Sequence, residues 1–251
     1  MPDTQPASSA NAAHFRTEAD DVFGRIASRY DLLSDLFSFG IHRHWKRRVA
    51  TLIGGESWSH LLDAAAGTGD VVLRVIRGQR LLPGQKIIVS DISPQMLAIA
   101  RRRAGQAQAL DFRILDAHAM PTIADASIDL YSISLGLKIC DRTRIFSEAL
   151  RVLRPGGRFV ALEASNLAWP WLHRSYLTYM SLCMPFIGWV ATGGDASAYR
   201  YLLKGIQDFP TAEGLADEMV AAGFEEVRFE RLSLGIVAVH VARKPRIKGA
   251  A

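Results

Sequence analysis

Hydrophobic and polar positions follow two alternating patterns along most of this chain. Short apolar runs, which are typical of buried strands, alternate with stretches whose apolar residues recur every three or four positions, which is typical of helices. The expected strands are the run that begins at Leu61 and residues 86–91, 110–115, 128–133, 158–164, 225–232 and 236–243. This alternation predicts an α/β fold, a mostly parallel seven-stranded sheet with helices on both faces.

Helix start and stop signals lie between these strands. Helical patterns are expected at residues 70–76, 93–100, 142–153 and 211–223. Ser93 is suited to cap the N-terminus of its helix, with Pro94 at the first helical position. The helix at 142–153 should stop at Pro155-Gly156-Gly157, because proline and glycine end helical patterns.

Two further segments do not belong to the alternation. Residues 18–53 are helical in pattern and rich in aromatic side chains, and they could form a lid or simply pack against the sheet. Residues 167–192 are apolar and aromatic; they could line a pocket for a bulky apolar substrate, lie in a membrane interface or pack into the core. We expect residues 1–17 to be disordered, residues 18–244 to form one domain and residues 245–251 to form a tail.

The strongest chemical signal lies after the first strand. The apolar run from Leu61 leads into Gly67-Thr68-Gly69, where glycine permits a tight turn and leaves room for a ligand beside the backbone. Asp70 then begins a helical pattern. A strand, a glycine loop and a helix N-terminus in this order predict a nucleotide-type pocket at the carboxyl edge of a parallel sheet.

The second strand supplies an acid at the spacing of a ribose contact. Asp91 ends residues 86–91, about 20 residues beyond the loop. The third glycine of a dinucleotide fingerprint is missing, and the charges of Asp63 and Asp70 would repel a pyrophosphate. The same charges suit S-adenosylmethionine, which carries a sulfonium and an amine and no phosphate. We therefore predict an S-adenosylmethionine site; a glycine turn in another doubly wound protein is the alternative.

Composition narrows the class of protein. The 251 residues are 49% hydrophobic and 22% charged, with a net charge of +5 and no lysine-arginine block of the kind that binds nucleic acid. Cys140 and Cys183 stand far apart, so we expect neither a disulfide framework nor a metal site. The N-terminus lacks the apolar core of a signal peptide. No uninterrupted apolar run reaches the roughly 18 residues of a membrane-spanning helix.

Several sequence blocks resemble one known family. Beyond the glycine loop, the blocks are Ser38-Phe39-Gly40-Ile41-His42-Arg43 with Trp45-Lys46, Arg151-Val152-Leu153 with Pro155-Gly156-Gly157, and Gly235-Ile236-Val237-Ala238 with His240. Through these blocks, residues 20–244 are similar to the ubiquinone/menaquinone biosynthesis C-methyltransferases, a family of class I S-adenosylmethionine-dependent enzymes. The resemblance implies a Rossmann-like methyltransferase sheet with an N-terminal helical lid.

The resemblance also implies a set of cofactor contacts. They are expected at Thr68, Asp91, Asp116, Ala117 and Ser134, and the loop and strand ends add Asp63, Gly67, Gly69 and Ile92. The positions that the resemblance implies coincide with strand ends or the glycine loop, where ligands of open α/β sheets bind.

The substrate side departs from the family pattern. The family usually has Phe-Gly-Leu-Arg-Asn after the fourth strand, and its Arg-Asn pair is associated with the proton lost from the quinol ring. This chain has Leu135-Gly136-Leu137-Lys138-Ile139, and lysine keeps the charge without the planar fork of arginine. Lys138 is the first candidate for contact with the methyl acceptor. Tyr30, Asp31 and His42 are the other candidate catalytic residues.

These features predict methyl transfer from S-adenosylmethionine to a ring carbon of a quinol-type or related aromatic acceptor. The alternatives are an O- or N-methyltransferase for another small aromatic or lipid-like acceptor, and a non-catalytic protein that binds S-adenosylmethionine. The expected partner is a small aromatic or prenylated quinol-type substrate, and no nucleic acid. Peripheral membrane contact and a homodimer are left open, and the expected location is the cytoplasm, including the inner face of the membrane.

Overall fold

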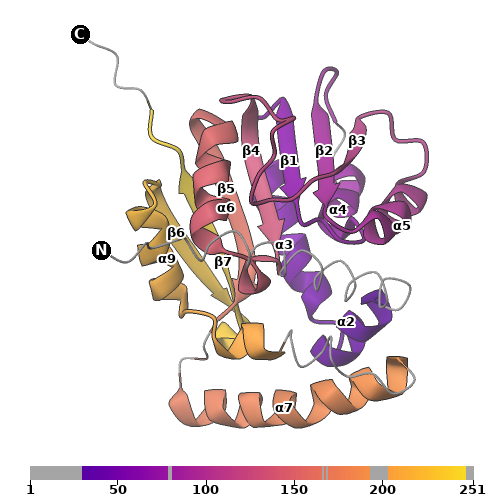
Figure 1. The fold of residues 1–251 in the computed structure, drawn as a ribbon, viewed down its shortest axis with the longest axis vertical. Helices are drawn as coiled ribbons and strands as arrows, with labels where there is room; N and C mark the ends of the chain where they lie inside the picture. The colour runs from indigo at the N-terminus through magenta and orange to yellow at the C-terminus, as the bar shows by residue number, and fades with distance from the viewer. Residues whose placement is uncertain (1–29, 79–80, 166, 168, 193–202, 247–251) are drawn as a thin grey trace, which may run out of the picture.

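A seven-stranded sheet forms the centre of the molecule (Figure 1). The computed structural model describes residues 30–78, 81–165, 167, 169–192 and 203–246. The strand order is β3-β2-β1-β4-β5-β7-β6. The strands are β1 (His60–Ala64), β2 (Lys86–Asp91), β3 (Leu110–Ile114), β4 (Ile128–Ser134), β5 (Leu153–Ala164), β6 (Glu225–Leu232) and β7 (Val237–Arg243). The first five run parallel and β7 is antiparallel to both of its neighbours, so the predicted fold class is confirmed.

Helices begin and end close to the predicted signals. They are α2 (Tyr30–Ser38), α3 (His42–Gly54), α4 (Asp70–Gly78), α5 (Pro94–Ala104), α6 (Arg142–Val152), α7 (Pro170–Thr192) and α9 (Ala212–Ala221), with 3-10 turns η2 (Leu137–Ile139) and η3 (Ser233–Gly235). Ser93 Oγ accepts a hydrogen bond from the Met96 N–H at 3.3 Å, and Pro94 is the first residue of α5. The predicted helix cap is therefore confirmed.

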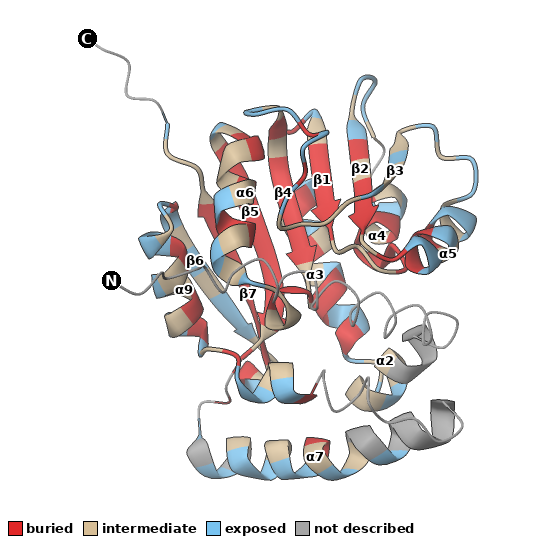
Figure 2. Ribbon diagram, in the orientation of Figure 1, coloured by how far each residue is buried: buried red, intermediate tan, exposed pale blue. Residues whose placement is uncertain are grey.

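Each face of the sheet carries its own apolar core. Successive strand residues point to opposite faces, so Leu61 and Leu62 belong to different clusters. The Leu61 cluster includes Trp45 of α3, Val71 of α4 and Leu97 of α5. The Leu62 cluster includes residues of α6 and α9, and Figure 2 shows the central strands β1, β2 and β4 as mostly buried, whereas β6 is largely exposed. This two-sided cover holds the strand ends, where a ligand would bind, in fixed positions.

One boundary differs from the prediction. Pro155-Gly156-Gly157 does not separate helix from strand, because β5 starts at Leu153, directly after α6. Gly156 donates a backbone hydrogen bond to Lys244 O at 2.9 Å, and Lys244 donates one to Gly157 O at 2.9 Å. Lys244, which follows β7, therefore extends the sheet by pairing with Gly156 and Gly157, where the sequence pattern predicts an interruption between helix and strand.

Helix α7 lies at the end of the molecule where β1, β2 and β4 end (Figure 1). It contacts α2, and the rings of Phe39 and Tyr179 stack with centroids 6.4 Å apart. Among the residues of 167–192 whose exposure is described, Leu167 and Met180 are buried and the others are half-buried or exposed. Packing into the core therefore does not describe most of these residues. None of the helices in the described ranges is long and apolar enough to cross a membrane.

The predicted disordered segment, residues 1–17, lies outside the described residues, as does most of the predicted tail. The region predicted as a helical lid is represented by α2 and α3, separated by a turn in which Phe39 and Gly40 have positive φ angles of 49° and 74°. Helix α3 packs against α4 beside the predicted cofactor loop, as the packing alternative expects. The role as a lid stays a prediction.

Candidate functional site

Asp63 stands at the carboxyl end of β1, completely inside the protein. Its Oδ1 accepts a hydrogen bond from Ser132 Oγ of β4 at 2.5 Å. Burial, as the largest effect, raises the pKa of Asp63 to about 7, although the Ser132 hydroxyl and the Lys46 ammonium both lower it. Asp63 therefore holds a proton for part of the time near neutral pH, and its oxygens are both an acceptor and a donor for a polar ligand.

The two loop glycines serve different purposes. Gly67 and Gly69 have φ angles of +56° and +78°, in the left-handed region that glycine adopts most easily. A Cβ at Gly67 would meet no atom within 4 Å, whereas a Cβ at Gly69 would lie 3.0 Å from Ala100 Cβ of α5. Gly67 thus leaves open space in front of the loop, and Gly69 allows the start of α4 to approach α5.

Asp91 connects the end of β2 to the glycine loop. Its Oδ2 accepts the Gly67 N–H at 2.7 Å, and its Oδ1 accepts the Ser93 N–H at 2.9 Å. These two bonds orient the carboxylate at the end of β2 beside the loop. This is the arrangement expected of an acid that accepts hydrogen bonds from ribose hydroxyls. Ile92 follows it and is half-buried.

Thr68 and Asp70 are held by cations that the sequence analysis missed. Arg103, at the end of α5, donates to Thr68 O at 3.1 Å and to Thr68 Oγ1 at 2.9 Å. Asp70 Oδ1 lies 2.8 Å from Arg103 Nη2 and 2.9 Å from Arg74 Nη1, and Asp70 Oδ2 lies 3.1 Å from Lys46 Nζ.

These contacts contradict the expectation that the negative charge of Asp70 attracts a cationic ligand. Although burial raises the pKa of Asp70, the Lys46 ammonium and the Arg74 guanidinium outweigh it and hold the pKa below its ordinary value. Asp70 is therefore ionised but matched by three cations. It does not supply free negative charge to attract a cationic ligand, and Asp63 and Asp91 are the acids left for that purpose.

Ser134, at the end of β4, completes a small cavity beside the loop. The cavity has a volume of about 30 Å³, and its lining includes Lys46, Asp63, Gly67, Thr68, Asp70 and Ser134. Ser134 Oγ is buried and has no hydrogen-bond partner among the described residues. Buried hydroxyls are normally satisfied, so this oxygen suits a bound polar group.

Asp116 and Ala117 follow β3, next to the end of β2, where the Leu115 N–H donates to Asp91 O at 3.1 Å. Asp116 Oδ1 lies 2.6 Å from His118 Nδ1, and His118 Nε2 accepts the Asp141 N–H at 3.0 Å. Because Nε2 is an acceptor, the neutral ring carries its hydrogen on Nδ1 and donates it to Asp116. Asp116 is two residues away in the same loop, but the second partner, Asp141, is 23 residues further along the chain, so the sequence did not single out His118.

Lys138 lies in the 3-10 turn four residues after Ser134. Its side chain is buried, its ammonium donates to Leu135 O, and Nζ lies 3.8 Å from Glu163 Oε2 of β5. Burial lowers the pKa of Lys138, opposed by the charge of Glu163. Burial likewise raises the pKa of Glu163, opposed by Lys138. Lys138 is therefore not a solvated surface residue.

Glu163, which lies within the strand expected at residues 158–164 and was not among the candidate site residues, also holds the turn. Its Oε1 accepts the Leu137 N–H at 2.6 Å, and its Oε2 accepts the Ala164 N–H at 3.1 Å. A helical segment at residues 203–207 packs on the same turn, because a Cβ at Gly205 would lie 2.7 Å from Lys138 O. Local packing thus fixes the turn that carries Lys138.

The structure says less about the other three candidate catalytic residues. His42 is buried at the start of α3, its Nδ1 lies 2.8 Å from Ser38 Oγ, and burial lowers its pKa. These contacts give His42 a structural role in the turn between α2 and α3. Tyr30 is the first residue of α2, and its side chain, like that of Asp31, lies outside the described part of the chain. Catalytic roles for Tyr30, Asp31 and His42 remain predictions.

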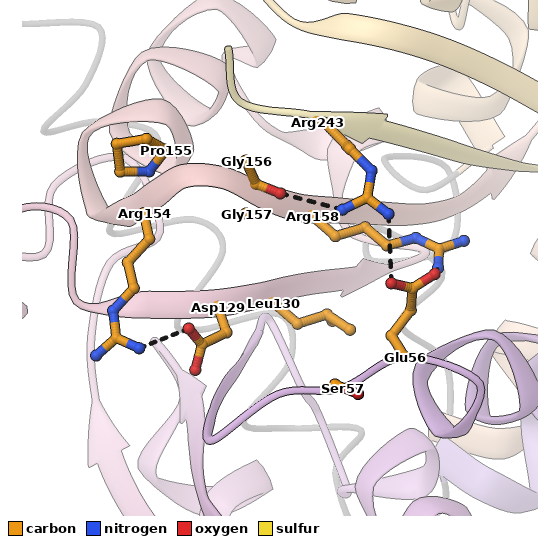
Figure 3. A pocket seen from close by; sticks show the side chains of 10 residues that line it. All are labelled: Glu56, Ser57, Asp129, Leu130, Arg154, Pro155, Gly156, Gly157, Arg158 and Arg243. Atoms are coloured by element: carbon orange, nitrogen blue, oxygen red, sulfur yellow. Dashed lines mark hydrogen bonds and ion pairs between the residues drawn. The ribbon is translucent and has the colours of Figure 1, made fainter. Parts of the chain in front are cut away.

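A larger cavity, of about 180 Å³, lies at the opposite edge of the sheet (Figure 3). It is lined by residues at the amino ends of β4 and β5, where its charged groups already pair with each other. Arg154 Nη1 lies 2.6 Å from Asp129 Oδ1, and Arg243 Nη2 lies 3.4 Å from Glu56 Oε2. Ligands of open α/β sheets bind beyond the carboxyl ends of the strands, so we assign the site to the smaller cavity.

The residues at the carboxyl edge fit S-adenosylmethionine. Asp63, Gly67, Thr68 and Ser134 line one cavity, Asp91 is hydrogen-bonded to the loop, and Asp116 and Ala117 follow the neighbouring strand. The carboxyl groups of Asp63 and Asp91 and the open space at Gly67 suit a ligand with hydroxyl and ammonium groups and no phosphate. So does the buried hydroxyl of Ser134, which has no hydrogen-bond partner in the described part of the chain. The individual contacts remain predictions.

Solved structures similar to this chain share the methyltransferase fold. One is described as a SAM-dependent methyltransferase and possible histamine N-methyltransferase from Thermotoga maritima, with a TM-score of 0.63 and 19% identity over 90% of this chain and 99% of that one. Another is human N-acetylserotonin methyltransferase in complex with SAM, with a TM-score of 0.58 and 19% identity over 96% of this chain and 60% of that one. At such identities the similarity concerns the fold.

Closer relatives are named ubiquinone/menaquinone biosynthesis C-methyltransferases. The protein from Rubrivivax gelatinosus is 41% identical over 225 residues, which cover 89% of this chain and 85% of the relative. The protein from Acidiphilium cryptum is 38% identical over 229 residues, or 90% of each chain. The model of the ubiE/COQ5 methyltransferase family matches residues 11–244, and the chain therefore belongs to the ubiE/COQ5 methyltransferase family.

Proposed function

We propose that this protein transfers a methyl group from S-adenosylmethionine to a ring carbon of a quinol-type aromatic acceptor. The observation that carries the proposal is the buried pair of Lys138 and Glu163, which follows the cofactor edge at the end of β4. Lys138 stands where the family carries the arginine of its Arg-Asn pair, and Glu163 reaches it from β5. The relatives reported above are named as enzymes of ubiquinone/menaquinone biosynthesis.

The cofactor supplies an activated methyl on a positive sulfur. The chain's own residues orient the reactants: Asp91 holds the ribose hydroxyls, and Asp63 and Ser134 hold polar groups at the end of β1 and β4. Lys138 contacts an oxygen of the acceptor and stabilises its negative charge, which makes the adjacent ring carbon more nucleophilic. Glu163 keeps the ammonium in place. The ring proton must also leave, and a basic group near the ring assists that step.

Because Lys138-Ile139 replaces the family's Arg-Asn, a second class of methyl acceptor is also a candidate. Ile139 has no polar side-chain atom, so the chain handles the acceptor with one charged group where the family uses two polar ones. An O- or N-methyltransferase for a small aromatic or lipid-like acceptor is consistent with this change. A non-catalytic protein is disfavoured, because the cofactor edge is complete and a buried charged pair stands beside it.

A labelled-methyl assay tests the proposal. Purified protein is incubated with methyl-labelled S-adenosylmethionine and a panel that contains a demethylated prenylated quinol, a phenol, an aromatic amine and a fatty acid. We expect label on a ring carbon of the quinol, and none with Asp91→Ala as the matched inactive variant. Label on an oxygen or nitrogen would replace the proposal by the second class of acceptor. Absence of label on every acceptor, with cofactor binding intact, would contradict methyl transfer to these classes.

We further propose that α7 and the α2–α3 turn rest on a lipid surface. Large apolar residues are exposed there: Leu36, Phe39, Ile41, Trp169, Trp171, Leu182 and Phe186. Trp171, Leu182 and Phe186 are each about two-thirds exposed, at 68%, 69% and 66%. Aromatic side chains favour the membrane interface, and a prenylated acceptor would be dissolved in the membrane. This proposal places a cytoplasmic protein at the inner face of the membrane.

Vesicle flotation tests the lipid contact. The protein should float with phosphatidylcholine vesicles, and a variant with Trp171→Ser, Leu182→Ser and Phe186→Ser should remain at the bottom of the gradient. A homodimer could bury the same surface instead. In that case light scattering would give twice the chain mass for the wild type, one chain mass for the variant, and no flotation for either.

A further inference from the structure

Lys46 is a buried lysine on α3 beside the glycine loop. It is only 7% exposed, and it lines the same small cavity as Asp63, Gly67 and Ser134. The side chain reaches this place because Trp45 and Val49 of α3 are packed into the core on that face of the sheet. Lys46 is the one cation that lines this cavity in the described part of the chain.

Lys46 shares its close carboxylate partner, Asp70, with two other cations, and its charge also acts on Asp63. Lys46, Arg74 and Arg103 share the carboxylate of Asp70, with distances of 3.1, 2.9 and 2.8 Å. An ammonium has three donors, and Asp70 is the one hydrogen-bond partner of Lys46 Nζ recorded among the described residues. A buried cation with unused donors costs free energy unless a further acceptor is supplied. A ligand carboxylate at the cavity would be such an acceptor.

The strand order indicates which end of the cofactor reaches this cavity. Asp116 and Ala117 follow β3, Asp91 ends β2, and the cavity lies between the ends of β1 and β4. Asp63 and Ser134 lie on the β1–β4 side, and their oxygens suit an ammonium better than they suit the base. We therefore assign the amino-acid end of S-adenosylmethionine to the β1–β4 side and its base to the β3 side. That end carries one ammonium, which suits the oxygens of Asp63 and Ser134, and one carboxylate.

We propose that Lys46 binds the carboxylate of the amino-acid part of S-adenosylmethionine. This inference rests on the cofactor site proposed above and adds a residue from the N-terminal helices to it. Asp70 is then a positioning residue, which holds the ammonium at the cavity. Arg74 and Arg103 do not line the cavity, so they neutralise Asp70 while Lys46 remains directed to the ligand.

The test compares two ligands that differ only in this group. Isothermal titration calorimetry is run with S-adenosylmethionine and with decarboxylated S-adenosylmethionine, on the wild type and on Lys46→Met. Loss of one charge-assisted contact should weaken S-adenosylmethionine binding by about 10- to 100-fold. The affinity for the decarboxylated ligand should change by no more than about twofold. Lys86→Met, at the exposed start of β2, is the matched control and should change neither affinity.

The outcomes separate this inference from the rest of the site. Unchanged S-adenosylmethionine affinity in folded Lys46→Met, or equal losses for both ligands, would overturn the role of Lys46 while leaving the cofactor site and the acceptor proposal intact. Failure of the wild type to bind S-adenosylmethionine would instead contradict the cofactor site itself. If Lys46→Met does not fold, Lys46→Gln, which can still donate to Asp70, serves in the same comparison with the same expected selectivity.

Discussion

The Lys138 ammonium and the Glu163 carboxylate face each other inside the protein, with Nζ and Oε2 3.8 Å apart. They come from a turn after β4 and from β5, which are neighbouring parallel strands. Removing both charges from water is costly, and such a pair is weak evidence for stability alone. Because the pair lies just beyond the predicted cofactor site, we expect it to act on the methyl acceptor.

Lys138→Met should lower turnover by about 10²–10³, the usual effect of one lost electrostatic contact in a dry site. Cofactor affinity should remain close to that of the wild type, because Lys138 does not line the cofactor cavity. Lys138→Arg should recover only part of the rate, since a planar fork does not reproduce a point charge. Steady-state kinetics at saturating cofactor, with Lys86→Met as control, give the measurement. Wild-type turnover of Lys138→Met would move the search to Tyr30 and His42.

The two loop glycines should respond differently to valine. Gly67→Val has open space but a positive φ, so it should fold with a loss of about 1–2 kcal/mol and fail to bind the cofactor. Gly69→Val has the same backbone strain and also a contact of 3.0 Å with Ala100 Cβ. It should therefore lose more unfolding free energy than Gly67→Val. Urea denaturation and calorimetric titration measure both effects, and full cofactor affinity in Gly67→Val would place the cofactor elsewhere.

Ser134→Ala should separate binding from stability. The Ser134 hydroxyl is buried without a partner among the described residues, so its removal should leave the free energy of unfolding unchanged or raise it by up to about 1 kcal/mol. Cofactor affinity should fall by about 3- to 10-fold, the value of one neutral hydrogen bond. Ser132→Ala is the contrast, because Ser132 donates to buried Asp63 and its loss should destabilise the fold. Unchanged affinity in Ser134→Ala would remove Ser134 from the site.

The raised pKa of Asp63 predicts that the stability of the protein depends on pH. Its pKa in the folded protein is about 7, against an ordinary value of 3.8. Between these values the folded state binds more protons than the unfolded state, so the contribution of Asp63 to stability is present below pH 4 and is lost as the pH rises to 7. The neighbours that set this balance are Lys46, which lowers the pKa, and Asp91, which raises it.

Asp63→Asn keeps an acceptor for Ser132 but cannot ionise. Relative to the wild type, the variant should therefore gain unfolding free energy between pH 4 and pH 7, on the order of 4 kcal/mol at most. Urea denaturation of both proteins without cofactor at four pH values in this range gives the difference. A constant difference across the range would mean that Asp63 keeps an ordinary pKa in the folded protein.

Local patterns in the sequence determined the sheet, the glycine loop and the strand ends, because strand and helix periodicity and the turn chemistry of glycine depend on neighbouring residues. Asp91 and the Ser93 cap were predictable for the same reason. The tertiary structure decided the electrostatics, since Arg103 reaches Asp70 from 33 residues away and Glu163 reaches Lys138 from the next strand. Charges act through space, so no local pattern shows that Asp70 is neutralised, that Lys138 is buried or that Lys46 faces the cofactor cavity.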